Sequence, residues 1–193
     1  MLSSRVVIEG PPALLLVDAS RNLAGWEAEF CDRLCAAMLR RGLRLVGGRS
    51  LQVSGPEELG RHLPLLEAAN CLLLIGHGGQ TVPSASSELR GHWAWLRANV
   101  VGPKLLAFCS WADHDPAFSE EVLKAADDFA PLALAQESPV TSREGGLFLL
   151  KFFTELHLHS EVDMTGRMAW FSWSKATALL KRRRLTGSFG LRT

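Results

Sequence analysis

Short, mainly apolar runs alternate with longer amphipathic stretches along this chain. Residues 13–18, 71–75, 104–109 and 132–136 form such runs, which are typical of strands buried on both faces of a sheet. The stretches between them repeat apolar residues every three or four positions, as amphipathic helices do. The alternation predicts an α/β fold, a three-layer sandwich with a mostly parallel central sheet of about six strands and helices on both faces.

Glycine and proline residues mark the boundaries of these elements. Gly42 ends the first long helix, and Gly145-Gly146 precede the helix before last. Residues 51–53 either continue the strand at 43–46 or form its hairpin partner. Helices are expected at 25–41, 56–69, 88–100, 116–129, 147–158 and 165–183, and a last edge strand at 188–191.

Composition indicates an ordinary globular protein. The 193 residues are 47% hydrophobic and 21% charged, which excludes a disordered chain and fits a single domain over 1–193. The formal net charge of +1 gives no strong field to attract phosphates or anionic lipid, so neither nucleic acid nor a membrane is an expected partner.

The chain is expected to be cytoplasmic. No apolar stretch approaches the roughly 18 residues that a membrane span needs. Arg5 and Glu9 lie where a secretory signal would need an apolar segment. In that compartment the four cysteines would stay reduced.

Three of the cysteines are interpreted as core residues. Cys31 and Cys35 lie four apart on one helical face, where they either pack in the core or bind a metal with a third ligand. No CxxC motif or nearby histidine supports metal binding, so packing is favoured. Cys71 lies inside a predicted strand.

The fourth cysteine and one histidine lie at the predicted ends of neighbouring strands. His77 follows the strand at 71–75 within Gly76-His77-Gly78-Gly79, and Cys109 ends the strand at 104–109. Reactive groups collect beyond the carboxyl ends of parallel strands, and adjacent strands lie about 4.8 Å apart. The sequence therefore predicts that the imidazole and the thiol meet at one edge of the sheet.

Such a pair is the chemistry of a thiol nucleophile. A free thiol is only slightly ionised at neutral pH, and an adjacent histidine helps form the attacking thiolate and returns a proton to the leaving amine. The amides of Gly78 and Cys109 would stabilise the oxyanion. Read singly, the histidine is a turn residue and the cysteine a small core residue.

The order of these segments resembles the caspase-like, or clan CD, cysteine peptidases, and most closely the bacterial CHAT domains. His77-Gly78 and Cys109 are similar to that family's strand-end histidine and cysteine, although Phe108 precedes the cysteine and Ser110-Trp111 follow it, where the family commonly has alanine and a polar residue. Similarity extends over residues 13–191. It includes Glu137-Ser138-Pro139-Val140 with Phe148, Phe152, Phe153 and Leu156, then Ser160 to Leu180 and Gly187 to Leu191.

The resemblance implies a cysteine endopeptidase that acts on a protein or peptide substrate. It implies the catalytic residues His77 and Cys109 and no cofactor or metal. Control would come from a separate regulatory or activating protein or from self-processing. The residue before the scissile bond would lie near Asp18, Asp113 or Asp115, whose carboxylates favour arginine or lysine. Asp18 is equally interpreted as a cap on the turn that follows it.

Two other classes remain open. The first is a catalytically inactive caspase-like interaction module that docks a partner through aromatic anchors, for which the candidates are Trp93, Trp95, Trp111, Trp170 and Trp173. The second is a nucleotide-binding α/β domain, but neither a GxGxxG nor a Walker motif is present to bind phosphates.

Overall fold

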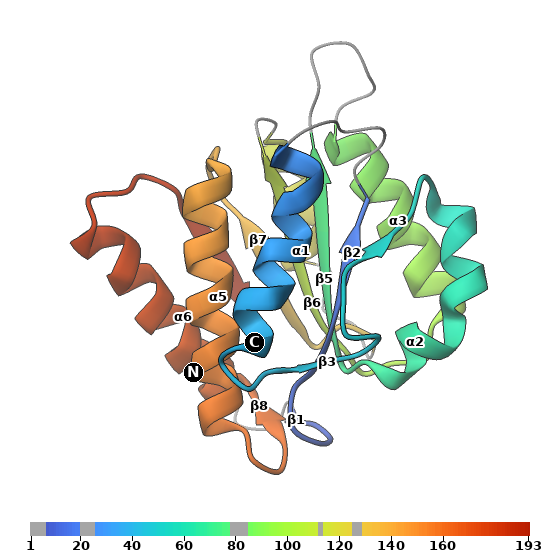
Figure 1. Cartoon of the computed structure of the whole chain (residues 1–193), viewed down its shortest axis with the longest axis horizontal. Coiled ribbons are helices and arrows are strands. Elements are labelled where there is room, and N and C mark those ends of the chain that lie inside the picture. The colour runs from blue at the N-terminus through green and yellow to red at the C-terminus, as the bar shows by residue number, and fades with distance from the viewer. Residues whose placement is uncertain (1–6, 20–25, 78–84, 112–113, 125–128) are drawn as a thin grey trace.

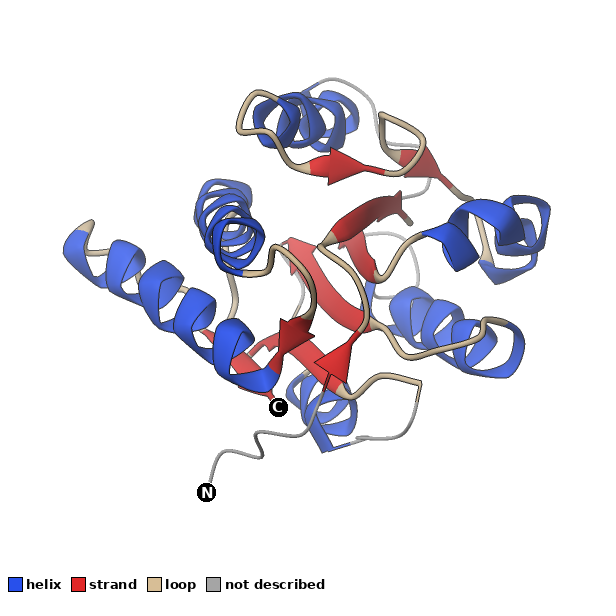
Figure 2. Cartoon of the chain, turned by 90° about the horizontal axis from the view of Figure 1, so that it is seen from below, coloured by secondary structure: helices blue, strands red, loops and turns tan. Residues whose placement is uncertain are grey.

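A computed structural model of the chain describes residues 7–19, 26–77, 85–111, 114–124 and 129–193, without the side chains of 26–28, 77 and 85–88. A mostly parallel seven-stranded sheet crosses the molecule, and helices cover both of its faces (Figures 1 and 2). Its main path runs β3-β2-β5-β6-β7-β9, and β4 also pairs with β2. The predicted three-layer α/β sandwich is confirmed.

The strands are short, and most have buried side chains on both faces. Their bounds are β2 Ala13–Asp18, β3 Arg44–Leu45, β4 Leu51–Gln52, β5 Cys71–His77, β6 Leu105–Trp111, β7 Leu132–Gln136 and β9 Phe189–Arg192. All pairs in this sheet are parallel except β7 with β9. Because β3 and β4 both pair with β2, the 51–53 run continues along the sheet edge and is not a hairpin partner.

The helices divide the core into two layers. On one face lie α1 Trp26–Leu39, α5 Ser142–His159 and α6 Gly166–Arg182; on the other lie η1 Pro56–His62, α2 Leu63–Ala68, α3 Ala85–Asn99 and α4 Pro116–Lys124. Alternate residues of β2 show the division, since Leu14 and Leu16 pack under α1 whereas Leu15 and Val17 face α2 and α3.

Several details of the structure differ from the sequence predictions. The helix expected at 56–69 is split at His62 and Leu63, because Pro64 cannot donate the amide hydrogen bond that a continuous helix needs. The helix expected at 147–158 begins at Ser142, so both Gly145 and Gly146 lie inside α5. A two-stranded antiparallel sheet of β1 (Val7–Ile8) and β8 (Met164–Thr165) was not expected.

Gly42 ends α1 as the sequence predicts. Its φ of +80° is a left-handed conformation that glycine adopts without steric cost. The chain then turns toward β3 at the sheet edge. Because β2, β5 and β6 are parallel neighbours, their carboxyl ends lie beside one another.

Candidate functional site

The register of β5 and β6 decides which residues lie beside His77. Ile75 pairs with Cys109, Gly76 with Ser110, and His77 with Trp111. The prediction that the strand ends at Cys109 is wrong, because β6 continues through Trp111, which also bridges to Val140. The strand-end partner of His77 is therefore a tryptophan. The His77 side chain and Gly78, the predicted oxyanion-hole residue, lie outside the described part of the chain.

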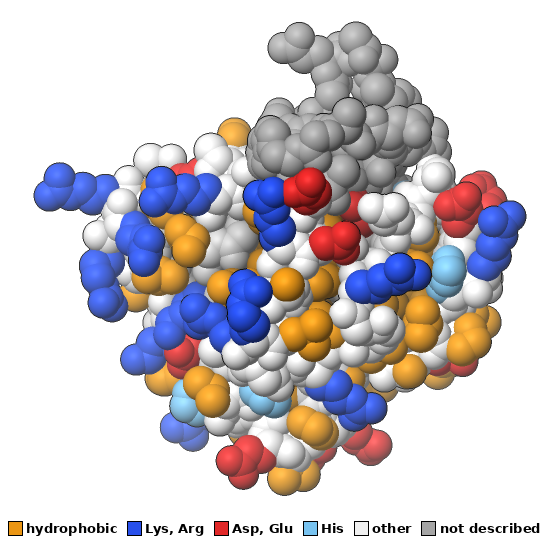
Figure 3. All heavy atoms as spheres, in the orientation of Figure 1, with side chains coloured by type: hydrophobic (Ala, Val, Ile, Leu, Met, Phe, Trp, Pro, Cys, Tyr) orange, Lys and Arg blue, Asp and Glu red, His pale blue; other side chains and the backbone are white. Residues whose placement is uncertain are grey.

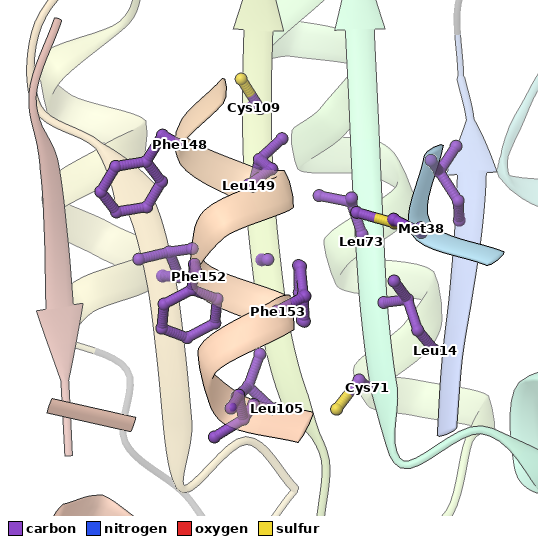
Figure 4. Close-up of a cluster of buried hydrophobic side chains, with 14 of the residues drawn as sticks. Leu14, Met38, Cys71, Leu73, Leu105, Cys109, Phe148, Leu149, Phe152 and Phe153 are labelled. Atoms are coloured by element: carbon purple, nitrogen blue, oxygen red, sulfur yellow. The ribbon is translucent and has the colours of Figure 1, made fainter. Parts of the chain in front are cut away.

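Cys109 is a core residue in this structure. Its side chain is fully buried in the layer between the sheet and α5, near Phe148 and Leu149 (Figure 4). Desolvation by burial raises the pKa of the thiol well above its usual value. The thiol is protonated at neutral pH as a result, whereas a nucleophile requires the thiolate.

Trp111 closes the space above the thiol. Its side chain is 2% exposed and packs edge-to-face on Phe30, with ring centroids 4.8 Å apart and an interplanar angle of 73°. The first turns of α5 also pack against the Trp111 indole. A methyl group at Gly145 would overlap the indole Cζ3 and lie 3.0 Å from Sγ of Cys109, so α5 approaches this closely only because residue 145 is glycine.

The acidic residues predicted to bind substrate occupy structural positions. Asp18 is 2% exposed, at the end of β2. Its carboxylate interacts with the thiol of Cys31, whose pKa rises through burial first and this carboxylate second. Asp113 lies outside the described residues.

Asp115 is at the start of α4, where it acts as a helix cap. Its Oδ1 accepts hydrogen bonds from the amides of Ala117 and Phe118, and Oδ2 forms an ion pair with Arg90 at 2.9 Å. Burial alone would raise the pKa of Asp115, but these amides and the guanidinium lower it overall. Pairing with Arg90 makes this carboxylate a poor candidate for binding a basic substrate side chain.

A small cavity lies on the opposite face of β6, bordered by Ser110, His114, Phe118 and Gln136. Its volume is about 10 Å³, room for about one water molecule. The Gln136 side chain accepts a hydrogen bond of 2.7 Å from the Ser110 amide. Ser110 Oγ and His114 Nε2 are buried and find no hydrogen-bond partner among the described residues. The cavity is too small for a peptide side chain.

Sequence reasoning missed Glu144, whose hydrogen bonds connect the start of α5 to the segment before β9. Its carboxylate accepts hydrogen bonds from the Thr141 amide and hydroxyl and, across the fold, from the amides of Thr186 and Gly187. The Thr141 amide is the largest cause, and with the other donors it lowers the pKa of Glu144 to about 2. The spacing Thr141-x-x-Glu144 is the capping-box pattern, which was available in the sequence.

The other three cysteines lie in the core, as the sequence analysis predicts. Cys31, Cys35 and Cys71 are buried as expected, and burial raises the pKa of Cys35 to about 12. Across the described residues, no three histidine, cysteine or acidic side chains form a cluster able to hold a metal ion.

Among the tryptophans proposed as anchors, burial separates one from the rest. Trp93 and Trp111 are buried and Trp95 and Trp173 are half-buried, whereas Trp170 is 43% exposed.

Comparisons with known proteins add no family to this description. No protein-family model matches the chain, and no curated protein matches its sequence.

Within the described segments, no helix combines the length and the apolar composition that crossing a membrane requires.

Proposed function

We propose that this chain is a catalytically inactive, caspase-like interaction module that acts by binding a partner protein. The observation that carries the proposal is the position of the thiol that the sequence predicts as the nucleophile: Cys109 lies beneath Trp111 and α5, fully buried, and Trp111 is the residue paired with His77. A thiol in this position is neither ionised nor open to a peptide carbonyl.

Catalysis by the predicted dyad would require a large rearrangement. Trp111 would have to leave its contacts with Phe30 and Gly145, and α5 would have to separate from β6 before a substrate carbonyl reached Sγ. Removing a buried tryptophan from a core typically costs about 3–5 kcal/mol, a large part of the stability of a small domain. The glycines of α5 instead fit the closed arrangement.

A turnover assay compares this proposal with the cysteine endopeptidase implied by the sequence. Wild type, Cys109→Ala and His77→Ala are incubated with a library of peptide substrates, including substrates with arginine or lysine before the scissile bond, and with a thiol-directed acylating probe. We expect no cleavage by any of the three and no rapid labelling of Cys109. Cleavage by wild type that both substitutions abolish would establish the endopeptidase instead.

A further inference from the structure

Basic side chains gather on the outer face of α6 and the turn that follows it. This segment has no acidic residue. Its basic residues, all exposed, are Arg167, Lys175, Lys181, Arg182, Arg183 and Arg184. No ion pair with a described residue neutralises them. Figure 3 shows Lys and Arg side chains over α6, at the left of the view, with hydrophobic side chains among them. Because the whole chain carries a formal charge of only +1, this face is far more positive than the rest.

Exposed aromatic side chains lie among these cations. Trp170 is 43% exposed and Phe171 is 36% exposed. Phe171 borders a surface hollow of about 380 Å³, which is also lined by His159, Thr165, Arg167 and Met168. The His159 ring packs edge-on against Phe171 with centroids 4.8 Å apart, and Lys175 Nζ lies 5.0 Å from the Phe171 centroid. The hollow thus offers an aromatic and thioether surface to an apolar side chain, with cations beside it.

The spacing of the cations specifies the shape of a matching ligand. Arg167 and Lys175 lie four residues before and after Phe171, which is about 6 Å along the helix axis in each direction. An extended peptide advances roughly 6.6 Å over two residues. A segment with the pattern acidic, any residue, apolar, any residue, acidic therefore aligns its two carboxylates with the two cations while its central side chain enters the hollow.

Building on the proposed binding function, we propose that the α6 docking face, defined as Arg167, Trp170, Phe171 and Lys175, binds an extended acidic segment of another protein. Charge complementarity selects the carboxylates, and the hollow selects the apolar residue between them. The last turn of α5 and the loop that follows it support a protein ligand over nucleic acid, since Leu158 and Val162 are 59% and 73% exposed and apolar side chains make no favourable contact with phosphates. A hollow, rather than a protruding apolar ridge, also favours insertion of a partner's side chain over insertion into lipid.

Fluorescence anisotropy with a labelled peptide tests this assignment. The probe carries Glu-Ser-Leu-Ser-Glu between neutral flanks, and matched peptides replace leucine by serine or both glutamates by glutamine. We expect saturable, salt-sensitive binding of the first peptide and at least a tenfold weaker affinity for each of the others. Arg167→Glu/Lys175→Glu should abolish binding, and Phe171→Ser should weaken it at least tenfold.

The control reverses the same amount of charge away from α6. Arg40→Glu/Arg61→Glu changes two exposed cations, one in the turn directly after α1 and one in η1, and should retain the wild-type affinity. Circular dichroism checks that each variant is folded. If both double variants lost the same peptide affinity, overall charge alone would explain the effect, and the docking face would be overturned. Absence of peptide binding would also overturn the docking face. The same holds if Arg167 and Lys175 bind anionic phospholipid vesicles or single-stranded oligothymidylate but do not bind the peptide. A chain that neither cleaves peptides nor binds this probe keeps its inactive assignment and loses only this surface.

Discussion

The carboxyl end of β6 and the outer face of α6 use aromatic side chains in opposite ways. At the end of β6, Trp111 is 2% exposed and fills the space between Phe30 and Gly145. On α6, Trp170 and Phe171 remain exposed among cations that form no ion pair with any described residue. The residue types that indicate chemistry in the sequence lie in the first region, and the groups accessible to a ligand lie in the second. Accessibility, rather than residue type, separates a core from a site.

The largest expected effect comes from Gly145→Val at the closed end. The Cβ of the new side chain would overlap the Trp111 indole, so we expect a loss of about 3 kcal/mol in the free energy of unfolding, measured by chemical denaturation. Gly91→Ala is the matched control in α3, where a methyl group meets Pro56 Cγ at 3.6 Å, an ordinary contact. That variant should change stability by less than about 1 kcal/mol. If Gly145→Val were as mild as the control, the closed packing would be incorrect.

Glu144→Gln tests the hydrogen bonds that hold α5 against the segment before β9. We expect a loss of about 2 kcal/mol at neutral pH, because charged acceptors of several amide donors are replaced by a neutral amide. In the wild type the pKa of Glu144 is about 2, below its ordinary 4.5. Its stabilising contribution is therefore complete above pH 4.5 and is lost as the pH falls toward 2. Denaturation of both proteins across this range should give converging stabilities, and parallel curves would contradict the assignment.

Cys109→Ala should have a modest effect, about 1 kcal/mol of stability, since it removes one buried sulfur and leaves a small cavity. Binding of the acidic peptide to the α6 docking face should stay at the wild-type level. Thermal unfolding and anisotropy measure the two quantities on the same preparation. A loss of peptide binding with Cys109→Ala would link the two regions and contradict their separation.

Trp170→Ser should have the smallest effect on folding, less than about 0.5 kcal/mol, because the side chain lies on an exposed helix face. Peptide affinity should nevertheless fall, because exposed aromatic side chains of a docking face contribute strongly to binding. The ratio of the two effects sharpens the contrast with Gly145→Val, which should lower the stability of the chain without changing residues of the docking face. A stability loss comparable to that of a core substitution would show that Trp170 packs within the fold.

Much of the fold was predictable because the central strands are buried on both faces. The apolar runs at Ala13–Asp18 and Leu132–Gln136 coincide with β2 and β7, since burial on both faces leaves little room for polar residues. The two-residue strands β1 and β8 were not predictable, because they are too short to show a period.

The candidate site was less predictable, because the sequence pattern is misleading at two residues, Ser110 and Gly145. Ser110 interrupts the apolar run and suggests that the strand ends at Cys109, but the Gln136 side chain binds its amide and the strand continues. Gly145 is expected to break a helix, whereas its role depends on the indole that lies against it. In both cases the structure depends on contacts between residues far apart in the chain. The hydrophobic pattern of a single segment carries no information about such contacts.

The accessibility of each thiol tests the central claim most directly. Native protein is treated with iodoacetamide at neutral pH, and modification of each cysteine-containing peptide is followed by mass spectrometry, with Cys31, Cys35 and Cys71 as buried internal references. We predict that Cys109 reacts as slowly as these three, about a thousandfold or more below the rate in the denatured chain, because reaction must await unfolding. Rapid modification of Cys109 alone, slowed by His77→Ala, would show an activated and exposed thiol and would contradict the account.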